Sequence, residues 1–293
     1  MGIMLLDAHF LKKLEHLKFV FRRQRALFEG EGPQSARRGG GMIEFRDYKK
    51  YSPGNDYRYI DWNVYSRIGQ LFIKEFSKEE SVLINLLLDK SGSMSMDHDK
   101  WINALQLAAA FSFVGLGGQN KVRIWTSAGG GLEKSQMYIS EGHVKQLFDF
   151  LEGIAPGGGT DLAGSLKKLG ARLPVGSFVL VISDFLDESP VKEVLRLLRA
   201  RRFEIAAVQL LSLEEWEPGF AGASSAQDVE TGEEVAFYFD EQARGLYMKA
   251  LSRLQDGWRH FCIQHGLSYH LVRKRESSVD SVLRFLARAG VHK

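Results

Sequence analysis

One short apolar segment that ends on an aspartate places the strongest constraint on how this chain can fold. Leu83–Leu88 is almost entirely apolar, Asp89 follows it directly, and Ser91 and Ser93 come next at alternating positions. A helical pattern begins a few residues later, so the order is buried strand, loop and helix. In open α/β sheets such loops lie at the carboxyl ends of the strands, where ligands bind.

The alternation of strands and helices continues along the rest of the chain. Strands are expected at Ser81–Leu88, Lys121–Ser127, Gln136–Ser140, Ser177–Ser183, Glu204–Leu211 and Ser268–Val272. Helices are expected at Lys100–Gly117, Glu141–Gly153, Val191–Ala200, Glu241–His265 and Ser278–Ala289. This order predicts an α/β fold with a doubly wound, mainly parallel sheet over residues 81–293. Thr231-Gly232 predicts a hairpin inserted at about 227–239.

The loop after the first strand has the chemistry of a metal site. Its position allows Asp89, Ser91 and Ser93 to point their side-chain oxygens into one space. Three hard oxygen donors, of which only one is charged, suit a Mg²⁺-like ion that keeps some of its waters. The spacing therefore predicts a divalent-cation site at this loop.

Two further loops contribute polar residues at corresponding places. Thr160 follows three consecutive glycines at a junction between loop and helix, and those glycines permit close approach of the backbone to a ligand. A threonine at such a junction can also be a simple helix N-cap, and Asp161 is expected to serve the start of that helix. Asp184 directly follows the strongly apolar strand Ser177–Ser183.

An amphipathic basic helix is expected near the start of the chain. Its apolar positions are Phe10, Leu14, Leu17, Phe21 and Leu27, with lysines and arginines between them. Such a helix suits a membrane surface or an acidic partner, but also a helix that packs on the body of the protein with a solvated basic face. The glycine- and arginine-containing stretch from 28 to 41 is expected to be a flexible loop.

Charged and aromatic residues alternate over 44–63. A turn is expected at Ser52–Asn55, between two such runs. Three arginines and four acids could form a structural ion-pair network, and an active site is the alternative. The residues concerned are Arg46, Arg58, Arg67, Glu44, Asp47, Asp56 and Asp61. The absence of a nearby nucleophile or histidine favours the structural network.

This segment also carries a family resemblance. Its pattern G-x-x-E-F-x-x-x-x-x-Y-x-P-G-x-D-x-R-x-I-D-W is similar to the signature of the bacterial DUF58 family. The matching residues are Gly41, Glu44, Phe45, Tyr51, Pro53, Gly54, Asp56, Arg58, Ile60, Asp61, Trp62 and Arg67. The resemblance implies two parts, an N-terminal helix with the signature segment at 1–80 and a von Willebrand factor A-like domain at 81–293.

The D-x-S-x-S spacing resembles the metal-ion-dependent adhesion site of von Willebrand factor A domains. That resemblance implies that Thr160 and Asp184 join Asp89, Ser91 and Ser93 around the ion, with Asp184 often acting through water. Mg²⁺ is the expected ion, with Mn²⁺ or Ca²⁺ as alternatives. The implied activity is metal-dependent binding of a partner's carboxylate. The family also implies work with a MoxR-type AAA+ ATPase on a client protein.

An enzyme is the competing class, as a metal-dependent hydrolase or phosphatase using Asp89 or Ser91. An aspartate-nucleophile phosphatase usually has a second acid two residues on, where this chain has Ser91. The segment Gly92–Met96 lacks the last glycine of a nucleophile elbow. We therefore expect no catalysis. A basic surface-binding module, on a membrane or on nucleic acid, is a third class, and steep salt dependence would mark it.

Charge, cysteine content and hydropathy indicate which partners and which compartment to expect for this protein. A net charge of +3 is too small to argue for nucleic acid. The single cysteine, Cys262, cannot form an internal disulfide and suits a reducing compartment. The longest apolar helical stretch, Ala104–Gly118, is too short to span a bilayer, so contact with a membrane would be peripheral. These features favour a cytoplasmic protein.

Overall fold

The computed structural model describes residues 6, 8–15, 27–28, 42–79, 81–186, 189–219, 222–227, 234–273 and 284. The chain divides into two compact units, one formed by residues 1–20 with 83–293 and the other by residues 21–82. The expected flexible loop at 29–41 and most of the expected last helix lie outside the described residues, as does most of the basic helix beyond α1.

A six-stranded sheet forms the centre of the larger unit. Its spatial order is β11 (Ser268–Arg273), β8 (Glu204–Leu211), β7 (Phe178–Ser183), β4 (Leu83–Asp89), β5 (Lys121–Ala128) and β6 (Gly131–Tyr138). The neighbouring strands from β11 to β5 run parallel, and only β6 is antiparallel, at the edge. This confirms the predicted α/β fold with a doubly wound, mainly parallel sheet.

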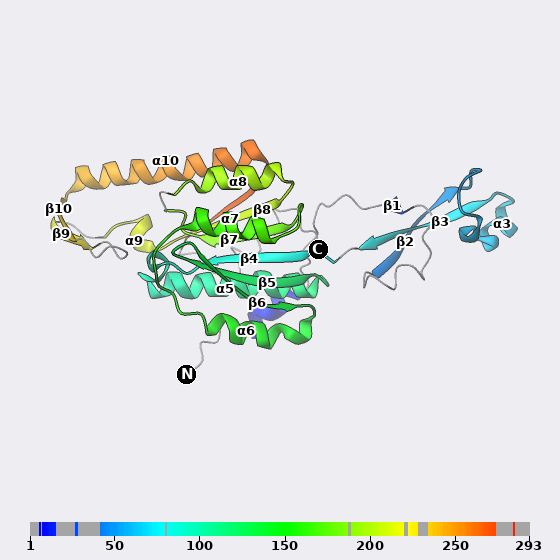
Figure 1. The fold of residues 1–293 in the computed structure, drawn as a ribbon, viewed down its shortest axis with the longest axis horizontal. Helices are drawn as coiled ribbons and strands as arrows, with labels where there is room; N and C mark the ends of the chain where they lie inside the picture. Colours follow the sequence, from blue (N-terminus) through cyan, green and yellow to red (C-terminus); the bar gives the residue numbers. More distant parts are fainter. Residues whose placement is uncertain are drawn as a thin grey trace. The chain divides into compact units, whose positions relative to one another are not determined.

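Helices cover both faces of this sheet (Figure 1). One face carries α5 (His98–Gly117) and α6 (Val144–Glu152), and α1 (Ala8–Leu14) contacts α5. The opposite face carries α7 (Leu162–Arg172), α8 (Val191–Ala200) and α10 (Glu241–His265). The shorter helices are α4 (Gly92–Ser95), η3 (Glu141–His143) and α9 (Leu213–Trp216).

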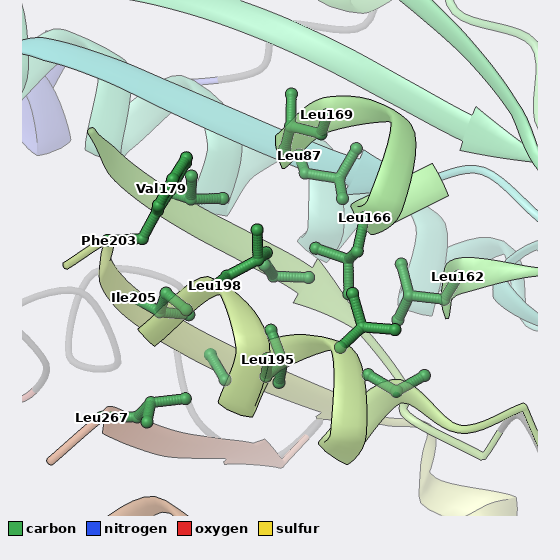
Figure 2. Packing of buried hydrophobic residues seen from close by; sticks show 14 of the residues in the cluster. Leu87, Leu162, Leu166, Leu169, Val179, Leu195, Leu198, Phe203, Ile205 and Leu267 are labelled. Carbon is green, nitrogen blue, oxygen red and sulfur yellow. The ribbon is translucent and has the colours of Figure 1, made fainter. Parts of the chain in front are cut away.

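The period-2 alternation of the buried strands supplies both faces with apolar side chains. Figure 2 shows Leu87, Val179 and Ile205 of three adjacent strands against leucines of α7 and α8. On the other face, Ile84 lies so close to Gly115 of α5 that a Cβ there would come within 2.6 Å of it. A larger residue at Gly115 would therefore require the end of the Ile84 side chain to shift.

The inserted hairpin consists of β9 (Gly222–Gln227) and β10 (Glu234–Phe239), paired antiparallel. The second strand lies where it was expected, but the first strand ends at Gln227 instead of beginning there. Its sequence, Gly-Ala-Ser-Ser-Ala-Gln, is small and polar and lacks the alternation of apolar residues that normally indicates a strand.

The smaller unit contains β1 (Leu27–Phe28), β2 (Met42–Lys50) and β3 (Phe72–Glu79), with β3 in the middle. Leu27 therefore belongs to a strand, although its helical spacing from Phe21 suggested a helix. Strand pairing with β3 takes precedence over that local pattern. The turn predicted at Ser52–Asn55 is present, because the Asn55 N–H donates to the Ser52 carbonyl over 3.0 Å.

Two short helices, η2 (Tyr57–Tyr59) and α3 (Trp62–Ile68), join β2 to β3. Asp61 caps α3, because its carboxylate accepts from the backbone N–H groups of Asn63 and Val64. It also pairs with Lys74 at 2.9 Å, and these contacts lower its pKa to about 2. The predicted ion pairing is confirmed for Arg58 and Asp56, whereas Asp61 pairs with a lysine instead of an arginine. The flanking Trp62 is exposed rather than buried.

Candidate metal-binding site

Asp89 stands at the carboxyl end of the central strand β4 and is 2 % exposed. Its Oδ1 accepts a hydrogen bond from the Ser91 N–H over 3.0 Å. Its Oδ2 accepts from the Ser183 hydroxyl of β7 over 2.7 Å. The carboxylate is therefore fixed between the ends of two adjacent parallel strands, at the edge where the sequence placed it.

The two predicted hydroxyl donors lie together beside it. The Ser91 and Ser93 Oγ atoms are 3.1 Å apart, and Ser91 is fully buried. Ser91 is the N-cap residue of α4, so the chain turns into this short helix within the motif itself. In contrast, the Ser95 hydroxyl donates back to the Gly92 carbonyl over 2.8 Å and does not join the pair.

The glycine loop before Thr160 is bonded directly to the Asp89 loop. The Gly157 N–H donates to the Lys90 carbonyl over 2.7 Å, and the Gly92 N–H donates to the Gly158 carbonyl over 2.9 Å. Gly157 and Gly158 have φ angles of +140° and +94°, which side chains rarely adopt. The glycines thus bring one backbone against another and set half-buried Thr160 two residues beyond this junction.

Thr160 is not the helix cap. The N-cap of α7 is Asp161, whose carboxylate accepts from the Gly164 N–H over 2.7 Å. This confirms the expectation that Asp161 serves the start of the helix. The capping alternative for Thr160 is excluded.

Asp184 follows β7 as predicted, and its carboxylate is 1 % exposed. Its Oδ2 accepts from the Lys100 ammonium over 2.9 Å, and its Oδ1 accepts from the Leu186 N–H over 3.1 Å. The structure therefore links Asp89 to Ser91 and Ser91 to Ser93 by hydrogen bonds. It places Asp184 on the adjacent strand end, where a lysine holds it.

Lys100 and Glu215 are the residues that the motif analysis missed. The Lys100 ammonium also donates to Glu215 Oε1 over 2.7 Å and to the Ser93 carbonyl over 3.2 Å. Burial of Lys100 could have been predicted from the sequence, because helical spacing places it on the same face of α5 as the buried residues Ala104 and Phe111. The capping-box spacing of Ser212 and Glu215 marks the start of α9, which places Glu215 beside the site.

Burial and neighbouring charges shift the pKa values of two groups at this edge of the sheet. Burial, together with the nearby Asp184 carboxylate, raises the pKa of Asp89 to about 6, although hydrogen bonds from Ser183 and Ser91 act in the other direction. Burial alone would lower the pKa of Lys100, but the carboxylates of Asp184 and Glu215 outweigh it and raise that pKa.

The backbone immediately after Asp184 adopts an uncommon conformation. Phe185 has a φ of +52°, a region that bulky residues rarely occupy. Its N–H donates to the Ser183 hydroxyl over 3.0 Å, and its buried ring packs on Trp258 with centroids 4.7 Å apart. These contacts hold the strained turn, and the turn fixes where Asp184 lies.

The donor set fits a divalent cation. Asp89 is a buried carboxylate, and within the described part of the chain it has no ion pair. Two neutral hydroxyls lie next to it, and hard oxygen donors of this kind are what Mg²⁺ takes. A cation bound there would offset the charge that burial and Asp184 make unfavourable on Asp89.

Comparison with known proteins identifies the family. The family model described as "Protein of unknown function DUF58" matches residues 47–256, which is more than half of the chain. The chain belongs to the DUF58 family. The predicted resemblance is thus confirmed at the family level, and the match covers most of the signature segment and both strand ends of the candidate site.

Similar proteins include two uncharacterized mycobacterial proteins, Mb1516 of Mycobacterium bovis and Rv1480 of Mycobacterium tuberculosis. Each is 26 % identical to this DUF58 protein over 206 residues, which is 68 % of this chain. The chain spans 65 % of the length of these relatives.

Two solved structures also resemble this DUF58 protein. One is an aerotolerance-related membrane protein from Bacteroides fragilis, with 16 % identity, a TM-score of 0.45, and 71 % of this chain and 98 % of that chain covered. The other is a von Willebrand factor type A protein from Catenulispora acidiphila, with 13 % identity, a TM-score of 0.37, and coverage of 73 % and 43 %. Among the described residues of this DUF58 protein, no helix combines the length and apolar character needed to cross a membrane.

Proposed function

We propose that this protein is a metal-dependent protein-binding module. A divalent cation, with Mg²⁺ as the first choice and Mn²⁺ or Ca²⁺ as alternatives, is held by Asp89, Ser91 and Ser93, and Thr160 and, through water, Asp184 complete the set. The observation that carries the proposal is Asp89, a buried carboxylate without an ion pair in the described chain, beside two clustered hydroxyls.

The bound ion would supply an electrophilic position that a partner's aspartate or glutamate can occupy. The chain's own residues prepare that position. Asp89 provides the negative charge, and Ser183 and the Ser91 N–H fix its orientation. Ser91 and Ser93 add neutral donors, which leave most of the ion's charge available for a partner's carboxylate.

The surroundings of the Ser91 and Ser93 hydroxyls favour a binding function over hydrolysis. The hydroxyls of Ser91 and Ser93 bond to one another, and in the described part of the chain no histidine contacts either of them. A serine nucleophile needs such a base within hydrogen-bond reach. Turnover of generic phosphate or ester substrates with Mg²⁺ that was lost in Ser91→Ala would instead support the hydrolase alternative.

The proposed partners are a MoxR-type AAA+ ATPase and a client protein, with this chain as the adaptor between them in the cytoplasm. Membership of the DUF58 family supports this choice of ATPase. A buried free cysteine, Cys262, suits that compartment. The modest net charge of +3 argues against nucleic acid as a partner.

The test is capture of the purified ATPase by the immobilised chain with Mg²⁺. An AAA+ ATPase uses Mg²⁺ itself, so chelation alone cannot locate the effect, whereas a substitution in this chain can. We expect Asp89→Ala to abolish capture and Asp149→Ala, which removes an exposed acid from α6, to leave capture unchanged. Equal capture by all three proteins would contradict a metal-dependent interface.

A further inference from the structure

Lys100 is the only lysine among the described residues whose side chain is wholly buried, and it sits at the edge of the candidate metal site. It reaches there from the first turn of α5. Its ammonium has three hydrogen-bond acceptors: Asp184 Oδ2 at 2.9 Å, Glu215 Oε1 at 2.7 Å and the Ser93 carbonyl at 3.2 Å. All three donor hydrogens of the ammonium can therefore be satisfied.

The lysine does not occupy the position proposed for the ion. None of its hydrogen bonds reaches the Asp89 carboxylate or the hydroxyls of Ser91 and Ser93, which contact one another and Ser183 instead. The edge of the sheet thus holds two separate polar clusters. Among the described residues, no cationic side chain pairs with the cluster around Asp89, whereas Lys100 pairs with the cluster around Asp184.

Ser93 connects the two clusters on the side of α4, and Ser183, which precedes Asp184, connects them on the side of β7. The Ser93 hydroxyl faces Ser91 and the Ser93 carbonyl accepts from Lys100. A lysine at this place does two things: it neutralises the second acid at the site, and it fixes the turn that carries one of the proposed ligands. Lys100 would therefore affect a bound ion only indirectly, through Asp184 and Ser93.

We infer that Lys100 is a positioning residue that keeps the Asp184 carboxylate from binding the ion directly, so that Asp89 is the only charged ligand of the metal. This rests on the proposed function. An ion with one charged ligand remains strongly electrophilic toward a partner's carboxylate, whereas a second direct carboxylate would strengthen metal binding and weaken that attraction. Lys100 therefore determines how strongly the ion attracts a partner's carboxylate.

Glu215 is the second anchor of this lysine. Its other carboxylate oxygen accepts from the Ser212 N–H over 2.7 Å, and its carbonyl accepts from the Tyr247 hydroxyl of α10 over 2.6 Å. These contacts hold Glu215 in place, and Glu215 in turn prevents Lys100 from rotating away from Asp184.

The test measures Mn²⁺ binding to the full chain by electron paramagnetic resonance, with folding checked by circular dichroism. Lys100→Met keeps an unbranched side chain that is one atom shorter and removes the charge, which frees Asp184 Oδ2. We expect it to raise Mn²⁺ affinity about tenfold, and we expect the double variant Lys100→Met with Asp184→Asn to lose that gain. A lysine with only a structural role would lower affinity or leave it unchanged when replaced.

A second comparison keeps the inference testable if Lys100→Met does not fold. In the wild-type background, Asp184→Asn should lower Mn²⁺ affinity no more than about tenfold, whereas Asp89→Asn should lower it at least about a hundredfold. Equal losses would show Asp184 to be a direct ligand and overturn the inference, while the metal site itself would stand. A wild-type chain that binds no Mn²⁺ would overturn both the inference and the proposed function.

Discussion

The Nζ atom of Lys100 lies 2.9 Å from Oδ2 of Asp184, and the two side chains are 0 % and 1 % exposed. The pair joins the start of α5 to the end of β7, two segments 84 residues apart in sequence. A buried ion pair of this kind adds little net stability over a well-packed apolar pair, but it is costly to break from one side.

Replacement of Asp184 by alanine should therefore destabilise the fold. Lys100 would retain Glu215, but one carboxylate would then have to balance a fully buried ammonium. We expect the free energy of unfolding to fall by about 1.5–3 kcal/mol, the cost of one lost charge-assisted hydrogen bond, because Glu215 still neutralises the ammonium. Urea denaturation in EDTA measures this, with the exposed Asp149→Ala as the control, and a loss no larger than the control's would show that the pair is not stabilising the native state.

The metal-free chain should become more stable when Asp89 is replaced by asparagine. The native pKa of Asp89 is about 6, above its ordinary value of 3.8, so the ionised form is disfavoured by folding. A shift of this size corresponds to about 2–3 kcal/mol. We expect Asp89→Asn to stabilise the chain by an amount of this order at pH 7.5 in EDTA.

The stabilisation of the metal-free chain by Asp89→Asn should depend on pH in a defined direction. A raised carboxyl pKa contributes stability that is fully present below pH 3.8 and is lost as the pH rises through about 6. The advantage of Asp89→Asn should therefore be largest above pH 6.5 and vanish near pH 4. Thermal melts at both ends of this range test it, and an advantage independent of pH would contradict the assignment.

The fold was largely predictable from local pattern, because β4, β7 and β8 are short, mainly apolar runs that form the centre of the sheet. Val191–Ala200, Glu204–Leu211 and Glu241–His265 lie where they were predicted. The first strand of the hairpin was misplaced because Gly222–Gln227 contains small and polar residues, and only its pairing with β10 makes it a strand. Leu27 was assigned to a helix because the long-range pairing of β1 with β3 leaves no local trace.

The candidate site was predictable only where its residues follow a strand. Asp89 and Asp184 are adjacent to apolar runs, so parallel topology alone brings them to one edge of the sheet. Lys100 and Glu215 come from helices whose approach to that edge depends on packing. The ion pair between Lys100 and Asp184 is a contact across 84 positions that no local pattern encodes.

In the smaller unit, Asp61→Ala should loosen α3. The carboxylate caps this seven-residue helix and also accepts from the Tyr48 hydroxyl over 2.9 Å. We expect protection of the Gly69 amide, which closes the last turn of α3, to fall about five- to tenfold in hydrogen exchange. Asp47→Ala, an exposed neighbour, should change it little. Unchanged protection in Asp61→Ala would argue that α3 is held by other contacts.

Cys262 should be unreactive in the native protein. Cys262 belongs to α10, its side chain is buried in the core at 1 % exposure, and burial raises its pKa to about 12. At pH 8 the thiolate fraction should be about a thousandfold below that of an ordinary thiol. Iodoacetamide labelling followed by mass spectrometry measures this with and without urea. Rapid labelling without urea would mean that α10 leaves the body of the protein.

The central claim is that Asp89, Ser91 and Ser93 bind a divalent cation, and calorimetric titration with Mg²⁺ at pH 7.5 tests it most directly. Ser93→Ala removes one proposed ligand, whereas Ser95→Ala removes a hydroxyl that bonds to Gly92 instead. We predict one ion per wild-type chain, loss of binding in Asp89→Asn, weaker binding in Ser93→Ala and unchanged binding in Ser95→Ala. Absence of binding to the wild-type chain, or equal binding by all four proteins, would contradict the account.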